Sequence, residues 1–143
     1  MKRETELPER CTRFLIDSNL FIAAVKNGWT KSSELLSVLL DGSFELVANR
    51  SLLAEYEKYA QQLDAEYVFF YMKSRIILTD QSEDEIQRCN PFFPESQASD
   101  VVHAATCLHA AAVLITNDKH FDKIRDAGLI RVWSISEAIK NLL

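Results

Sequence analysis

Glycine, proline and cysteine are scarce in this sequence, with only three of each among 143 residues. So few glycines and prolines leave no disordered or low-complexity tract, and 48% hydrophobic with 26% charged residues is typical of a helix-rich globular protein. The cysteines, Cys11, Cys89 and Cys107, are odd in number and widely scattered. They form neither a disulfide framework nor a metal-binding spacing, so we expect free thiols in a reducing compartment.

Long apolar runs are also absent. No segment approaches the roughly 18–20 consecutive apolar residues that are needed to span a bilayer. Residues 1–10 are charged and lack an apolar core, so no signal peptide is expected. We therefore expect a soluble, cytoplasmic protein without membrane contact, organised as one domain over residues 1–143.

Positive charge is the third shortage, because 16 Lys and Arg residues stand against 21 Asp and Glu residues, for a net charge of −5. This balance argues against a domain that holds nucleic acid by charge alone. It leaves open an enzyme that binds nucleic acid through a metal ion and a local basic rim.

Short apolar runs alternate with segments of helical periodicity along the sequence. Strands are expected at residues 13–16, 44–48, 76–78, 113–116 and 130–133. Helices are expected directly after residue 17, at 32–40, 52–59, 65–73, 98–112, 119–126 and 137–143, and as a short helix with a stiff loop within 80–94. This alternation predicts an α/β fold of three layers, α/β/α, in which helices cover both faces of a parallel sheet of about five strands.

Two local features carry expectations about the helices. Candidate N-caps are Asn49 or Ser51 before the helix at 52–59, and Ser96 or Ser99 before the helix at 98–112. The helix at 65–73 is expected to carry Tyr67, Val68, Phe70 and Tyr71 on its apolar side. The aromatic cluster at residues 67–72 is expected in the core or at a dimer surface rather than as a platform for base stacking.

Acidic residues recur where expected strands pass into helices. They are Asp17, Glu55, Asp100 and Asp118. Any one of them could merely complement a helix dipole, which is worth roughly 0.3–1 kcal/mol. In a parallel sheet, however, all strand-to-helix junctions lie along one edge, and gathered carboxylates repel one another unless a cation neutralises them. Hard oxygen ligands without a His or Cys cluster favour Mg²⁺ or Mn²⁺, and such a site suits phosphodiester chemistry.

Four segments resemble the motifs of PIN-domain nucleases, and of the VapC-type toxins of toxin–antitoxin pairs in particular. They are Ile16-Asp17-Ser18-Asn19-Leu20-Phe21-Ile22, Leu53-Ala54-Glu55-Tyr56, Ala98-Ser99-Asp100-Val101-Val102-His103-Ala104-Ala105-Thr106 and Leu114-Ile115-Thr116-Asn117-Asp118-Lys119-His120-Phe121. The resemblance covers nearly the whole chain. It implies a PIN-like fold and a metal-dependent endoribonuclease acting on RNA, with an antitoxin protein as a possible partner and a homodimer as the expected assembly.

Carried over position by position, the resemblance makes the four acids the metal-binding and catalytic residues. It gives Asn19 and Thr116 a supporting role in the same site, and places Asn117 and Asp122 beside it. Asn117 is a departure, because many members of the family carry glycine at that position, and a side chain there could narrow the approach to Asp118.

The histidines allow two interpretations. His103 follows Asp100 by one helical turn, so it either orients a carboxylate or is a partly exposed structural residue, and the second is favoured. His109 and His120 share no ligand spacing with it, which makes a zinc site improbable.

Two other functions remain open from the sequence. A phosphoacceptor receiver domain is also a small α/β fold with clustered acids, but the order of its motifs fits this sequence poorly. A non-catalytic PIN-like module that binds nucleic acid or a protein is the main alternative to the ribonuclease.

Overall fold

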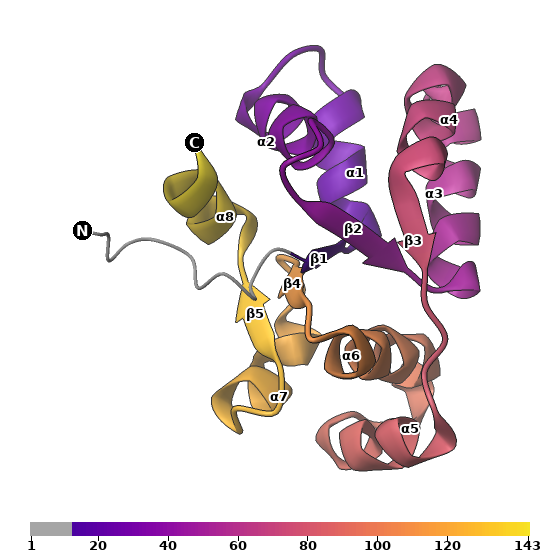
Figure 1. Cartoon of the computed structure of the whole chain (residues 1–143), viewed down its shortest axis with the longest axis vertical. Helices are drawn as coiled ribbons and strands as arrows, with labels where there is room; N and C mark the ends of the chain where they lie inside the picture. The colour runs from indigo at the N-terminus through magenta and orange to yellow at the C-terminus, as the bar shows by residue number, and fades with distance from the viewer. Residues whose placement is uncertain (1–12) are drawn as a thin grey trace.

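The computed structural model describes residues 13–143 (Figure 1). The expectations about Cys11 and about the charged segment at residues 1–10 lie outside the described residues. Among residues 13–143, no helix is both long enough and apolar enough to cross a membrane.

A five-stranded parallel sheet forms the centre of the fold, in the order β3-β2-β1-β4-β5. Its strands are β1 (Arg13–Ile16), β2 (Glu45–Ala48), β3 (Ile76–Leu78), β4 (Val113–Ile115) and β5 (Arg131–Trp133). This order differs from the 2-1-3-4-5 order of receiver domains, so the phosphoacceptor interpretation is wrong. The predicted α/β class and all five strands are confirmed.

Helices cover both faces of the sheet, which confirms the three layers (Figure 1). One layer contains, in packing order, α8 (Ile135–Leu142), α2 (Lys31–Leu39), α1 (Ser18–Val25), α3 (Arg50–Gln62) and α4 (Glu66–Arg75). The other contains α5 (Glu83–Cys89), α6 (Ala98–Ala110) and α7 (Asp122–Asp126). Short 3₁₀ turns precede α6 and α7: η1 (Asn90–Phe92), η2 (Glu95–Gln97) and η3 (Lys119–Phe121).

The hydrophobic core surrounds the two central strands. Phe14 and Leu15 of β1 and Leu114 and Ile115 of β4 have no exposed surface. Because these strands are buried on both faces, their sequences are continuous apolar runs, as expected for a parallel sheet. The carboxyl ends of β1 and β4 are therefore held by the best-packed part of the molecule.

The start of α3 agrees with the sequence, whereas the start of α6 does not. Asn49 caps α3, because its side-chain oxygen accepts the backbone N–H of Leu52 at 2.7 Å. Neither Ser96 nor Ser99 caps α6, whose N-cap position is Gln97 without a side-chain hydrogen bond. The turn η2 runs directly into α6, so the backbone is already helical where a capping serine was expected.

The core-facing side of α4 also differs from the sequence-based expectation. Phe69 and Met72 are buried, whereas Tyr67, Phe70 and Tyr71 are exposed. Residues 67–72 of this helix are apolar without a break, so periodicity alone did not identify the side that packs on α3. The side chains of Tyr67, Phe70 and Tyr71 therefore do not lie in the core, and their place at a dimer surface stays a prediction.

Candidate functional site at the carboxyl edge of the sheet

The predicted site residues Asp17 and Thr116 follow neighbouring strands directly. Ile16 of β1 pairs with Ile115 of β4, and the N–H of Asp17 donates to the carbonyl of Ile115 at 2.9 Å. From β1 the chain builds the sheet toward β2 and β3, and later returns to build β4 and β5 on the other side. The boundary between β1 and β4 is thus a topological switch point, where open α/β sheets bind their ligands.

The carboxylate of Asp17 is held on both oxygens. Only 8% of Asp17 is exposed. Its Oδ1 accepts the backbone N–H of Ser18 at 2.7 Å, which also caps α1. Its Oδ2 accepts the Thr116 hydroxyl at 2.7 Å and, at 3.4 Å, the side-chain amide of Asn19. These contacts fix the orientation of the carboxylate at the end of β1.

Thr116 connects Asp17 with Asp118. Its hydroxyl oxygen accepts the backbone N–H of Asp118 at 3.0 Å while its proton goes to Asp17. The amide of Asn19 donates to the same oxygen at 3.2 Å. The side-chain oxygen of Asn19 is buried and finds no hydrogen-bond partner among residues 13–143. One buried acceptor beside Asp17 is thus unsatisfied by the part of the chain that the structure describes.

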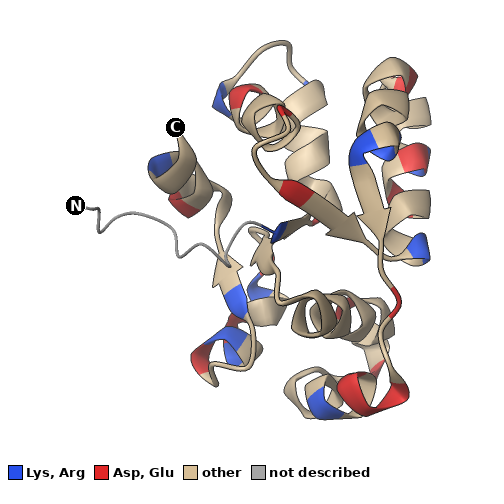
Figure 2. Cartoon of the chain, in the orientation of Figure 1, with Lys and Arg blue, Asp and Glu red and all other residues tan. Residues whose placement is uncertain are grey.

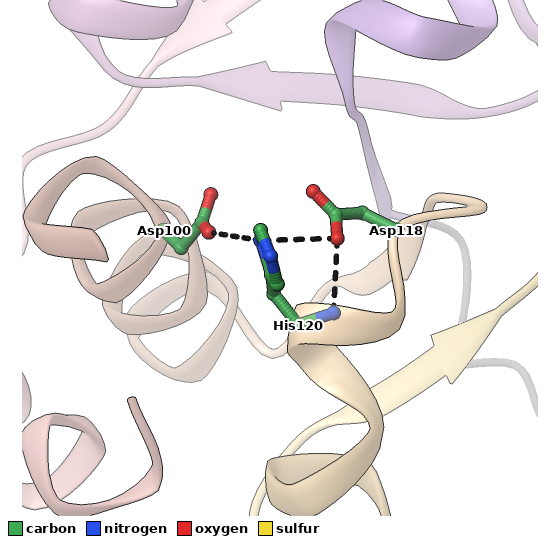
Figure 3. A group of neighbouring side chains, drawn as sticks. All are labelled: Asp100, Asp118 and His120. Carbon is green, nitrogen blue, oxygen red and sulfur yellow. Dashed lines mark hydrogen bonds and ion pairs between the residues drawn. The ribbon is translucent and has the colours of Figure 1, made fainter. Parts of the chain in front are cut away.

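The imidazole of His120 lies between the carboxylates of Asp100 and Asp118 (Figure 3). Its Nδ1 is 3.1 Å from Asp100 Oδ2 and 3.1 Å from Asp118 Oδ1, and its backbone N–H donates to Asp118 at 2.9 Å. One potential ligand atom from each of these residues lies within 4.8 Å of the others. With Asp100 ionised, its carboxylate accepts this hydrogen bond, and the proton then lies on Nδ1.

The electrostatic environment disfavours ionisation of Asp100. Burial raises the pKa of its carboxyl, and the negative charges of Asp118 and Asp17 raise it further, while the hydrogen bond from His120 opposes the shift. Asp17 affects the pKa of Asp100 although Asp17 follows β1 and Asp100 lies on α6. Three of the predicted acids therefore interact electrostatically.

Glu55 lies on α3, and two hydrogen bonds place it: one made by its neighbour Tyr56 and one made by Glu55 itself. The neighbouring Tyr56 is buried, and its hydroxyl donates to the carbonyl of Ile16, the residue before Asp17. Glu55 Oε2 lies 3.2 Å from Nε2 of His103. The hydrogen bond from His103 lowers the pKa of Glu55 against the effect of burial, and the Ser18 hydroxyl beside Asp17 lowers it further.

The structure brings the predicted acids together in two linked groups. Asp100 and Asp118 meet around His120, whereas Asp17 and Glu55 do not belong to that group of atoms within 4.8 Å. Asp17 is joined to the first group by Thr116. Glu55 lies near Ser18, the residue after Asp17, whose hydroxyl lowers the pKa of Glu55. The metal-binding role of all four acids stays a prediction.

The two flanking residues make contacts directed away from this cluster. The side-chain oxygen of Asn117 accepts the backbone N–H of Ile135 at 2.9 Å, at the start of α8. Asp122 forms an ion pair with Arg125 at 3.4 Å on α7. Their supporting role in the site also stays a prediction.

Sequence reasoning favoured the wrong alternative for His103 and overlooked the contacts of His120. His103 was expected to be a partly exposed structural residue, and this is wrong, because it is 2% exposed and contacts Glu55. His120 was set aside for lack of ligand spacing to another histidine. Its relevant neighbours are instead Asp118, two positions before it, and Asp100, which only the tertiary fold brings close.

Comparisons with known proteins agree with the fold. No family model matches the sequence, and no curated protein matches it. Among solved structures, the chain is similar to a chain of VapBC-1 from nontypeable Haemophilus influenzae, with a TM-score of 0.60 and 22% sequence identity. The match covers 87% of this chain and 98% of that chain. At this identity the likeness shows the fold, which is the PIN-like architecture expected from the sequence.

Proposed function

We propose that this chain is a metal-dependent endoribonuclease that hydrolyses RNA phosphodiester bonds and is the toxin of a toxin–antitoxin pair. The observation that carries the proposal is the gathering of carboxylates at the switch point of the sheet. Asp100 and Asp118 meet there, and Thr116 joins Asp118 to Asp17 through two hydrogen bonds. The acids come from junctions far apart in sequence, so helix capping at single positions does not explain their convergence.

Two features of this cluster support a divalent cation. Burial first, and then the negative charges of Asp118 and Asp17, raise the pKa of Asp100. A bound cation would offset the repulsion between these charges. The buried side-chain oxygen of Asn19 lacks a partner among residues 13–143 and is a hard oxygen donor. Carboxylate and amide oxygens fit Mg²⁺ or Mn²⁺. The residues that would hold the ion are Asp17, Glu55, Asp100 and Asp118.

The chain's own residues orient the reacting groups. When bound, the ion would supply Lewis-acid chemistry, acidifying water and neutralising charge on the phosphate. Thr116 and the N–H of Ser18 keep the Asp17 carboxylate fixed. The hydrogen bond from His103 lowers the pKa of Glu55, and Nδ1 of His120 lies between the other two acids.

Charge distribution supports binding of RNA through the cluster rather than through a broad basic surface. The net charge is −5, and in Figure 2 Lys and Arg segments alternate with Asp and Glu segments on α2, α5, α7 and α8. The phosphate of an RNA strand would otherwise meet a cluster of its own sign. A metal ion held by these acids would supply local positive charge for substrate binding.

An apolar surface supports a protein partner, either an antitoxin or a second copy of the chain. Trp29 at the end of the α1–α2 turn and Tyr67, Phe70 and Tyr71 of α4 are all more than half exposed. Exposed aromatic side chains at this density are typical of protein–protein contact surfaces. Light scattering on the isolated chain distinguishes a homodimer from a monomer that awaits its antitoxin.

The test is cleavage of labelled single-stranded RNA by the purified chain with Mn²⁺, with Mg²⁺ or with EDTA. We expect cleavage that requires the metal and is lost in Asp17→Asn and in Asp118→Asn. Asp80→Asn is the matched control, because Asp80 is an exposed acid in the loop after β3. RNA binding without cleavage by the wild type would favour the non-catalytic module instead.

A second measurement tests the metal without activity. A ligand that binds only the folded chain stabilises it by about 2.7 kcal/mol at a hundred times its Kd. Mn²⁺ should therefore raise the melting temperature of the wild type and of Asp80→Asn, and raise it much less in Asp17→Asn. Toxicity is tested by inducing wild-type and Asp17→Asn chains in cells, where only the wild type should arrest growth.

A further inference from the structure

A buried chain of polar side chains leads from the start of α3 to Glu55 by way of α6. Nδ2 of Asn49 lies 3.1 Å from Nδ1 of His103, and Nε2 of His103 lies 3.2 Å from Oε2 of Glu55. Asn49 and His103 are 4% and 2% exposed. Water therefore does not compete for the contact between Asn49 and His103, and the hydrogens there must be assigned within the chain.

The cap of α3 fixes the orientation of the Asn49 amide. Its Oδ1 accepts the N–H of Leu52 at 2.7 Å, so its NH₂ group is the one that faces His103. The same NH₂ group donates to the hydroxyl oxygen of Thr106 at 3.0 Å. Thr106 can accept there because its own proton goes to the carbonyl of Val102 at 2.8 Å. Turning the amide over would place the NH₂ group of Asn49 against the N–H of Leu52 and so break the cap of α3.

This orientation decides the tautomer of His103. An NH₂ donor at Nδ1 requires a lone pair on that nitrogen, so the ring proton must lie on Nε2. Nε2 is the nitrogen that faces Glu55, and it therefore donates to the carboxylate. A ring with protons on both nitrogens would place an N–H against the NH₂ group of Asn49.

We propose that His103 is a positioning residue for Glu55: Asn49 holds the imidazole as the Nε2–H tautomer, and that N–H fixes the carboxylate of Glu55 in the acid cluster. The importance of Glu55 for cleavage rests on the proposed nuclease function, whereas the tautomer and the orientation do not. His103 acts through Glu55 and has no role of its own in the reaction.

The position of His103 gives this contact a further consequence. His103 follows Asp100 by one turn of α6, while Glu55 belongs to α3 in the opposite helical layer. The hydrogen bond therefore ties the helix that carries one acid to the side chain of another.

Two amide substitutions separate positioning from simple filling of space. In His103→Gln the terminal NH₂ group reaches the place of Nε2 and can still donate to Glu55. In His103→Asn the shorter side chain reaches only the place of Nδ1 and leaves Glu55 without its donor. Both variants introduce the same polar group into the same buried position. His109→Gln is the matched control, because His109 also lies on α6 and pairs with a glutamate, Glu85, but is exposed.

We expect His103→Asn to lower the affinity for Mn²⁺, measured by calorimetry, and kcat for RNA cleavage, each by about 10–100-fold. KM for RNA should change little, because His103 does not contact the substrate. His103→Gln should recover most of both losses, and His109→Gln should match the wild type. Equal losses in the two His103 variants, or none in either, would overturn the positioning role.

The tautomer is measured directly by imidazole ¹⁵N NMR of the wild type at neutral pH, without metal. The spectrum should show His103 with a protonated Nε2 and an unprotonated Nδ1. Asn49→Asp keeps an oxygen cap on α3 but replaces the NH₂ donor by an acceptor, so it should place a proton on Nδ1. An Nδ1–H tautomer in the wild type overturns the inference even if every His103 variant fails to fold.

Failure of the nuclease proposal is distinguishable from failure of this one. If the wild type does not cut RNA, the proposed function is wrong, and the NMR and Mn²⁺ measurements still decide the role of His103. If the wild type cuts RNA and His103→Asn cuts equally well with the same Mn²⁺ affinity, the positioning role alone is wrong.

Discussion

The hydroxyl of Thr116 donates to the carboxylate of Asp17 at 2.7 Å, although 99 positions separate the two residues in sequence. The same oxygen accepts the backbone N–H of Asp118. A single hydroxyl at the switch point thus satisfies both the Asp17 carboxylate, as acceptor, and the Asp118 backbone N–H, as donor.

Removing the Thr116 hydroxyl should therefore weaken the fold as well as the site. Thr116→Val keeps the shape of the side chain but leaves Asp17 Oδ2 and the Asp118 N–H without this partner. We expect a loss of about 1–3 kcal/mol in the free energy of unfolding, measured in urea with EDTA present. Thr79→Val is the control, because Thr79 follows the edge strand β3 as Thr116 follows β4. A loss of similar size in both variants would contradict the specific role of Thr116.

Neutralising Asp100 should have a pH-dependent effect of defined sign. Burial, then the charges of Asp118 and Asp17, raise the pKa of Asp100 in the folded chain. The folded state therefore binds the proton more tightly than the unfolded state, and ionisation of Asp100 weakens folding as the pH rises. With EDTA, the wild type should lose stability relative to Asp100→Asn as the pH increases from about 4, the ordinary pKa of aspartate, to about 7.

Urea unfolding at several pH values measures this difference. The two proteins should be most alike at the acidic end, where Asp100 is protonated in both states. Saturating Mn²⁺ should reverse the order at neutral pH, making the wild type more stable than Asp100→Asn. If the wild type instead became more stable than Asp100→Asn as the pH rises in EDTA, the ionised carboxylate of Asp100 would be stabilised without a metal.

The hydroxyl of Tyr56 should matter through the backbone of β1. It donates to the carbonyl of Ile16, directly before Asp17, and lies entirely within the core. Tyr56→Phe removes the donor and leaves that carbonyl with one partner fewer, which we expect to cost about 1–2 kcal/mol. Tyr59→Phe on the same helix is the control and should change stability by less than about 0.5 kcal/mol.

Adjacent aromatic residues of α4 should differ sharply in their contribution to stability. Phe69 is 2% exposed and Phe70 is 63% exposed, and their rings contact each other at 5.8 Å between centroids. Phe69→Ala should cost about 3–5 kcal/mol, whereas Phe70→Ala should cost much less. Chemical denaturation at low protein concentration measures both. Equal costs would mean that the helix packs on a different side than the structure has it.

The sequence determined the strands, the α/β class and the candidate acids. Buried parallel strands must be short apolar runs, so Phe14–Ile16 could be predicted as a strand from the sequence. The first amides of α3 need an oxygen acceptor, so Asn49 could be predicted as its cap. The acids could be expected at one edge because strand-to-helix junctions of a parallel sheet share that edge. Local chemistry and one topological rule sufficed for these predictions.

Only the tertiary structure decided which partners each acid has. His120 meets Asp100, and His103 meets Glu55, across 20 and 48 positions of the chain. It also decided that Phe69 rather than Phe70 faces the core. Hydrogen bonds and packing between distant elements depend on how the helices lie across the sheet, and a helix that is apolar on every side carries no periodic signal of its orientation.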